Sequence, residues 1–132
     1  MTKTFVWSLL VSGLLPSLAQ AEPMNLRCSY TEASYSAAYM KQPESRKCPQ
    51  TRCYYDLRFD TEQTQATVNQ AEGYQFSQSD EQYKLYREME NPIVEGIDKS
   101  AFLINKSDLS YRSRKSTPPD VVIETSGQCE AF

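Results

Sequence analysis

The sequence predicts an all-β domain: a small antiparallel meander, closed as a barrel or folded as a sandwich, and stapled by disulfides. Short extended segments follow one another from residue 53 onward, and the polar breaks between them are too short for crossover helices. Four cysteines offer cross-links. Leu, Ile, Val and Phe total only 17 residues after position 21, about 15% of that part, which excludes a large aliphatic core.

The N-terminus has the three regions of a secretory signal peptide. Lys3 precedes an apolar run over residues 5–15, and Ala19-Gln20-Ala21 supplies the small residues of a cleavage site. The run is shorter than the roughly 20 residues that span a bilayer. We therefore expect residues 1–21 to be cleaved, leaving one domain over residues 22–132 that is not transmembrane and is periplasmic or secreted.

Residues 31–47 are open between one short helix and an ordered loop. Thr31 is a suitable N-cap, Tyr35 and Tyr39 are one helical turn apart, and Pro43 follows where such a helix would end. The many serines and tyrosines of this segment fit an ordered loop equally well.

Beyond this segment the pattern is that of strands. Residues 53–60 alternate strictly and predict a half-buried strand whose inward residues are Cys53, Tyr55, Leu57 and Phe59. Further strands are predicted over residues 65–69, 73–77, 82–88, 93–97, 101–105, 109–112 and 121–125.

The end of the chain continues this alternation. If residues 121–129 stay extended, Val121, Ile123 and Cys129 share one face, whereas a bulge at Gly127 would change that parity. The extended alternative is compatible with a terminal strand that is linked to the first strand through Cys28.

The cysteines favour two disulfides, because an even number in a small exported chain is typical of an oxidising compartment. Three connectivities are possible, and we favour Cys48–Cys53, which closes a short loop, together with Cys28–Cys129. The second joins the two ends of the domain and contributes roughly 4 to 5 kcal/mol in the chain-entropy model. A redox or zinc site is disfavoured, because four residues separate Cys48 from Cys53 and the chain has no histidine.

The absence of histidine also excludes Ser-His-Asp and Cys-His catalysis and histidine-ligated metals. Paired carboxylates remain, but Asp56 and Asp60 would lie about 13 Å apart on one strand and fit its polar outer face better than a glycosidase pair. We therefore expect a protein that is not an enzyme and needs no metal or cofactor. A carboxylate-dependent hydrolase is the least favoured alternative.

Nine tyrosines exceed what so small a core needs. Tyrosine offers a large contact area at low entropic cost and is enriched in interfaces, although cross-strand packing is an alternative role for each ring. The tyrosines expected to form an exposed binding patch are Tyr54, Tyr74, Tyr83 and Tyr86.

A basic cluster in an otherwise acidic chain gives a second candidate site. Arg112, Arg114 and Lys115 precede a proline-containing break. They fit either a solvated mobile loop or a contact with an acidic partner, a phosphate group or a membrane surface. Because the net charge after residue 21 is −4, we expect no nucleic-acid partner.

These features favour a non-enzymatic exported module that binds another macromolecule, a protein or an envelope component, with an inhibitor-like role as one form. Its size, signal peptide, disulfides and antiparallel architecture resemble those of the small periplasmic lysozyme inhibitors, whose inhibitory loop motif has no counterpart here. The alternative is a small β-barrel that binds an apolar or other small-molecule ligand. A buried pocket above a few hundred cubic ångströms would favour that alternative. The oligomeric state stays open.

Overall fold

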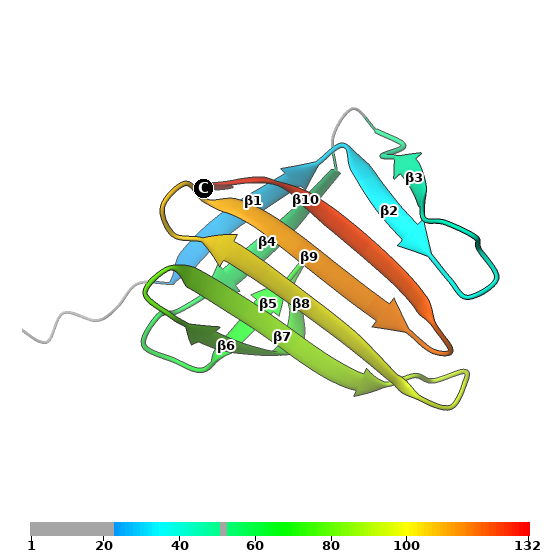
Figure 1. Ribbon diagram of the computed structural model, residues 1–132. Coiled ribbons are helices and arrows are strands. Elements are labelled where there is room, and N and C mark those ends of the chain that lie inside the picture. The colour runs from blue at the N-terminus through cyan, green and yellow to red at the C-terminus, as the bar shows by residue number, and fades with distance from the viewer. Residues whose placement is uncertain (1–22, 51–52) are drawn as a thin grey trace, which may run out of the picture.

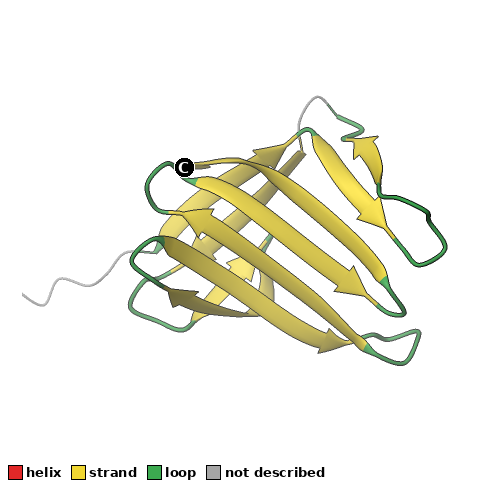
Figure 2. Ribbon diagram, in the orientation of Figure 1, coloured by secondary structure: helices red, strands yellow, loops and turns green. Residues whose placement is uncertain are grey.

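The structure, a computed structural model, describes residues 23–50 and 53–132 (Figure 1). Every regular element in these residues is a β-strand (Figure 2), so they include no helix able to cross a membrane. The predicted signal peptide, residues 1–21, lies outside the described residues. The strands are β1 (Met24–Tyr30), β2 (Glu32–Ser36), β3 (Glu44–Lys47), β4 (Cys53–Phe59), β5 (Gln65–Val68), β6 (Ala71–Gln78), β7 (Gln82–Glu90), β8 (Ile97–Asn105), β9 (Ser110–Thr117) and β10 (Val121–Ala131).

Eight of these strands form a closed antiparallel barrel. They pair in the order β1-β4-β5-β6-β7-β8-β9-β10, and β10 pairs back onto β1. The other two lie outside the barrel: β2 pairs with the first half of β10, and β3 pairs with β2. The predicted all-β meander is confirmed, and of the two architectures proposed for it the structure has the barrel.

Side-chain alternation builds the barrel wall. On β4, Leu57 and Phe59 point inward and are buried, whereas Arg58 between them is exposed, as the sequence pattern predicts. On β10, Gly127 stays in register opposite Tyr111, so no bulge changes the parity of the strand. The extended alternative for the end of the chain is confirmed.

Residues 31–47 form neither the short helix nor the ordered loop that the sequence left open. They contain the β2–β3 hairpin, in which Ala33 and Tyr35 face the same side as the inward residues of β10. A helix here would leave the edge of β10 between Val122 and Thr125 unpaired. Pairing with β2 satisfies those backbone groups, which outweighs the weak helical pattern.

The segments predicted as separate strands over residues 93–97 and 101–105 belong to the β7–β8 loop and to β8, and only the last residue of the first segment joins β8. In the loop, the Asn91 side-chain oxygen accepts hydrogen bonds from the backbone N–H groups of Ile93 and Val94, each 2.9 Å long. This side chain satisfies backbone donors outside the sheet. Ile93 is consequently 89% exposed rather than part of a strand.

The core fills the middle of the barrel and the end near the β6–β7 loop, which we call the packed end. Phe59 stacks on Phe76 with ring centroids 4.7 Å apart, and Tyr83 lies 5.0 Å from Phe59. These rings supply contact area that the few aliphatic residues cannot. The fully buried aliphatic side chains are Leu26, Leu57, Leu85 and Ile104.

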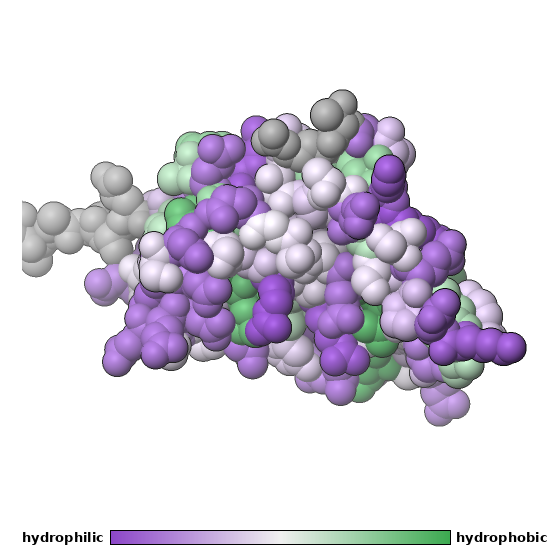
Figure 3. Space-filling view, turned by 45° about the horizontal axis from the view of Figure 1, so that its top comes forward, coloured by the Kyte–Doolittle hydropathy of each residue, from purple (hydrophilic) through white to green (hydrophobic). Residues whose placement is uncertain are grey.

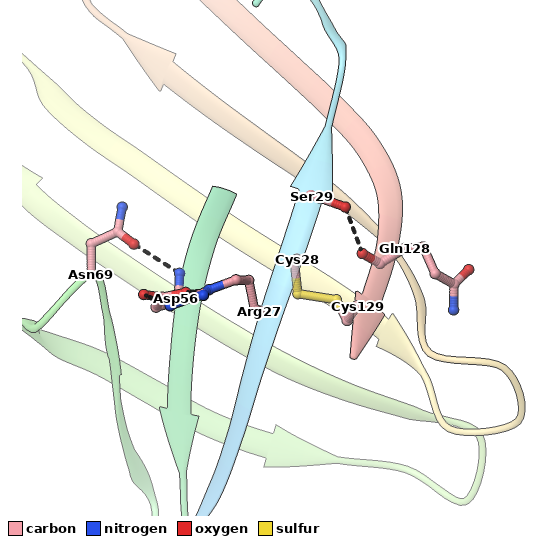
Figure 4. Close-up of polar contacts among 7 residues, drawn as sticks. All are labelled: Arg27, Cys28, Ser29, Asp56, Asn69, Gln128 and Cys129. Carbon is pink, nitrogen blue, oxygen red and sulfur yellow. Dashed lines mark hydrogen bonds and ion pairs between the residues drawn. A yellow bond between two sulfur atoms is a disulfide. The ribbon is translucent and has the colours of Figure 1, made fainter. Parts of the chain in front are cut away.

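The barrel closes where β1 meets the second half of β10 (Figure 4). Cys28 and Cys129 are directly opposite on these strands and form a disulfide, and a second disulfide joins Cys48 to Cys53. Both predicted pairings are confirmed. They are compatible with an oxidising compartment.

The outer side of the same region is held by polar contacts. Arg27 on β1 forms an ion pair with Asp56 on β4, with Nε 2.8 Å from the carboxylate (Figure 4). The Asn69 side chain accepts a hydrogen bond from the backbone N–H of Asp56. The pair is solvent-exposed, so it orients side chains more than it stabilises the fold.

The face of the barrel in Figure 3 carries mostly hydrophilic and weakly polar residues, and its hydrophobic residues form small separate patches. This face therefore offers no extended apolar contact surface.

Removing the two disulfides separately should have unequal effects. The Cys28→Ala/Cys129→Ala variant should lose more free energy of unfolding, because its loop of about 100 residues corresponds to about 4.7 kcal/mol and the short loop of Cys48→Ala/Cys53→Ala to about 2 kcal/mol. Urea unfolding of the oxidised proteins measures both changes. Equal losses of free energy of unfolding would show that the stabilisation by these disulfides does not depend on the length of the loop that each one closes.

Gly127→Ala should destabilise the barrel by about 1 to 3 kcal/mol or more, because overpacking strains both backbones. A Cβ atom at Gly127 would overlap the backbone carbonyl oxygen of Ser29 on the neighbouring strand. Thermal unfolding checks this result. Ser126→Ala is the matched control, because Ser126 is exposed on the opposite face of β10 and should change stability by less than about 0.5 kcal/mol. A Gly127→Ala protein as stable as this control would contradict the close packing.

Candidate ligand-binding site

The barrel is hollow at the end that carries the β7–β8 and β9–β10 loops, on the right in Figure 1. A cavity of about 400 Å³, which we call the cup, opens there between the inner faces of β7, β8, β9 and β10 and the side chains of β2. The lining residues used below are Tyr30, Tyr35, Tyr55, Tyr74, Arg87, Met89, Asp98, Ser100, Phe102, Ser113, Arg114, Lys115, Ile123 and Thr125.

Strand register explains which side chains line the cup. Residues directly opposite one another across neighbouring strands point to the same side of a sheet. One such row runs across five strands at the mouth of the cup, and its members are Arg87, Ser100, Lys115, Ile123 and Tyr35. Two cations and a tyrosine therefore lie in one row at the mouth.

The row below consists of Leu85, Phe102, Ser113, Thr125 and Ala33. All of these except Leu85 line the cup. The Thr125 hydroxyl contacts two others, with the Tyr111 hydroxyl 3.1 Å away and the Ser113 hydroxyl close beside it. On the opposite wall the Tyr74 hydroxyl lies 3.0 Å from that of Ser100. Small side chains at these inward positions leave the cavity unfilled, and hydroxyl groups make its lining polar.

Burial changes the acidity of the tyrosines in this network. Desolvation raises the pKa of Tyr111 to about 12, against a hydrogen bond with Thr125 that lowers it. Desolvation also raises the pKa of Tyr55, and its neighbour Tyr30, whose ring stacks on it at 5.2 Å, adds to the shift. Both hydroxyls therefore stay protonated at neutral pH and can donate hydrogen bonds.

Arg87 is the charged side chain on the inner face of β7. Its guanidinium lies over the Tyr74 ring, 4.7 Å from the centroid, and donates one hydrogen bond of 3.0 Å to the Glu72 carbonyl oxygen. None of the ion pairs among the described residues includes Arg87. A guanidinium has five N–H donors, so donors remain for a bound molecule.

A larger hollow of about 650 Å³ lies on the outer side of β5 and β6. Its lining includes the exposed side chains of Gln63, Gln65 and Gln75, and it is open to solvent. Ligand sites are concave and bury most of the ligand surface. The smaller cup meets this description better, because buried rings and hydroxyls surround it.

The four tyrosines predicted as an exposed patch do not lie together. Tyr54 is exposed on the outside of β4, near Arg27, and Tyr86 faces outward on β7. Tyr83 points inward at the packed end. Tyr74 is 6% exposed and forms a wall of the cup, so its predicted exposure is wrong. Its inward position on β6 follows from alternation with the exposed Gln75.

The predicted basic cluster lies in a strand, not in a mobile loop. Arg112 and Arg114 point outward from β9, and Arg114 borders the cup. Lys115 is in the mouth row, opposite Ile123. Pairing of β9 with both β8 and β10 continues past these charges, since long basic side chains are tolerated in a half-exposed strand.

Sequence reasoning missed Arg87, although a signal was present. Tyr83, Leu85 and Arg87 share one face of the predicted strand over residues 82–88. A charged residue that ends an apolar face is an unusual position, and it marks where the interior of the barrel becomes polar. Lys115, by contrast, belongs to the predicted basic cluster, and only its inward position on β9 was not foreseen.

The described residues include no group of three acidic or cysteine side chains arranged to hold a metal ion. No family model, curated protein or solved structure matches the chain.

Ionisation of Tyr111 should destabilise the fold at high pH. Its pKa rises from 10.0 to about 12 on folding, so its contribution to stability is complete below pH 10 and is lost as the pH rises toward 12. Urea unfolding between pH 8 and pH 11.5 should show a shallower decline for Tyr111→Phe than for the wild type. Tyr39→Phe, which changes an exposed ring, is the control and should keep the wild-type slope. Identical slopes for all three proteins would argue against a buried Tyr111 hydroxyl.

Proposed function

We propose that this chain is a non-enzymatic binding protein that holds a small molecule in the cup at the open end of its barrel. The supporting observation is the cavity of about 400 Å³, which lies within the usual range for small-molecule sites. A barrel of eight strands is wide enough to hold one small ligand when its inward residues do not fill it. The preference for a macromolecular partner, based on sequence alone, gives way to the small-molecule alternative for this reason.

The lining supports a polar rather than a purely apolar ligand. Hydroxyls of Tyr74, Ser100, Ser113 and Thr125 face one another across or beside the cavity. Each of these hydroxyls already has a hydroxyl partner but keeps further hydrogen-bonding capacity. An apolar molecule would leave that capacity unused, whereas a ligand with oxygen or nitrogen atoms can pair with it.

We further propose that residues 1–21 direct the chain out of the cytoplasm and are removed. The two disulfides support an oxidising destination, periplasmic or extracellular. The basic and apolar regions of the N-terminus support the same destination. The cup would then bind molecules that are present outside the cytoplasm.

A protein partner remains the second candidate because of the β7–β8 loop. Ile93 is 89% exposed at its tip, and Asn91 fixes the loop by hydrogen bonds to two backbone N–H groups. A loop held in one conformation loses little entropy when it binds. An apolar side chain on such a loop is a typical anchor in a protein interface.

Affinity capture tests the two candidates against each other. The oxidised protein is exposed to an extract of its own envelope and surroundings, and retained proteins and small molecules are both identified by mass spectrometry. The wild type should retain one small molecule in about equimolar amount. Ser100→Phe, which places a ring in the cup, should lose it, and Ala101→Phe, on the opposite face of the same strand, should keep it.

The result with these variants decides between the sites. A retained protein that is lost on Ile93→Asp and kept by Ser100→Phe would support the loop and contradict the cup. A small molecule retained equally by both phenylalanine variants would also contradict binding in the cup.

A further inference from the structure

We infer that the ligand of the cup carries an anionic group that binds between Arg87 and Lys115 at the mouth. This inference rests on the proposed small-molecule function and adds the chemical class of the ligand. It is supported by the charges around the cavity, by the spacing of these two cations and by the rings beneath them.

The charge at the cup is opposite to that of the whole protein. The chain has a formal net charge of −3, yet two basic residues, Arg87 and Lys115, face into the cup and only one carboxylate, Asp98, borders it. Lys99 and Arg114 point outward at its rim and add to the local positive charge. A cavity of one sign with low-dielectric walls concentrates ligands of the other sign. The local positive charge therefore selects an anion from the solution around an acidic protein.

Asp98 does not neutralise these cations by direct pairing. It accepts a hydrogen bond of 3.0 Å from the side chain of Asn91, which turns it toward the β7–β8 loop. The ion pairs of the described residues are Arg27–Asp56 and Arg46–Glu44, both away from the cup. The cations at the mouth thus keep their capacity to bind a ligand.

The register sets the distance between the two inward cations. Arg87 is opposite Ser100, and Ser100 is opposite Lys115, so two strand spacings of about 4.8 Å separate their backbones by about 10 Å. Both side chains are long enough for their charged ends to meet on one carboxylate, phosphate or sulfonate. The Ser100 hydroxyl lies between them as a further donor.

The cavity beneath these cations suits a flat body. Arg87 is stacked on the Tyr74 ring, which limits its motion, and the Tyr55 ring meets Phe102 edge-on at 5.0 Å. Aromatic walls favour offset stacking or edge contacts with another ring. An anion attached to an aromatic body would therefore use both the mouth and the walls.

Two dyes with the same aromatic framework test the inference. 8-Anilinonaphthalene-1-sulfonate carries a sulfonate, and N-phenyl-1-naphthylamine lacks it. Fluorescence titration of the oxidised wild-type protein should show tighter binding of the sulfonate. Arg87→Gln should weaken it about tenfold or more, as expected for loss of a charge-assisted hydrogen bond, and should change affinity for the neutral dye by less than about threefold.

Matched variants separate a specific site from a general charge effect. Lys84→Gln removes the same charge from the outer face of β7 and should leave sulfonate affinity unchanged. Lys115→Gln should weaken the sulfonate as Arg87→Gln does, and because Lys115 is exposed it keeps the test valid if Arg87→Gln fails to fold. Near-ultraviolet circular dichroism checks folding in each case.

The outcomes distinguish this inference from the function on which it rests. Equal affinity for the two dyes, unchanged by Arg87→Gln and Lys115→Gln but lost in Ser100→Phe, would overturn the anionic ligand and leave the small-molecule cup intact. If neither dye binds the folded wild type, or if Ser100→Phe binds both dyes as the wild type does, both proposals are overturned.

Discussion

The pairing of β1 with the second half of β10 is the constraint on which the rest of the structure depends. Four residue pairs, a disulfide between Cys28 and Cys129, and the close approach of Gly127 to Ser29 hold this seam. The chain beyond residue 21 has too few aliphatic residues to stabilise an open sheet of this size by burial alone. Closing the barrel pairs β1 with β10 and gives the aromatic side chains an interior to fill.

The same closure explains why one end is packed and the other is hollow. At the packed end, Phe59, Phe76 and Tyr83 fill the barrel by ring contacts. Toward the other end, β10 exchanges β1 for β2 as its partner, and the inward residues become small or charged around the cavity. The cup is thus a consequence of residue size along the strands, and polar side chains can line it because they reach solvent at the mouth.

Much of the fold was predictable because alternation and cysteine spacing are local signals. The inward face of β4 was predicted, and the two disulfides were the favoured one of three possible connectivities. The β2–β3 hairpin was not predicted, since it forms on an edge of β10 that is about 90 residues away in the chain. The candidate site was harder to predict from the sequence. Tyr74 was predicted to be exposed because the number of tyrosines does not tell which face of a strand each one occupies. The proximity of Arg87 and Lys115 depends on the register of β7, β8 and β9, which the sequence does not reveal.

The position of the seam also determines when the barrel can close during synthesis of the chain. A chain that is synthesised from its N-terminus presents β1 first and β10 last, so the barrel cannot close until nearly every residue has emerged. Before that moment β1 pairs only with β4, and its other edge is open to any strand that approaches. The order of synthesis also affects the disulfides. Cys48 and Cys53 are made almost together, whereas Cys28 is made about 100 residues before its partner Cys129. During that interval Cys28 is available for pairing with either of the others, which makes the early chain a natural substrate for disulfide isomerisation.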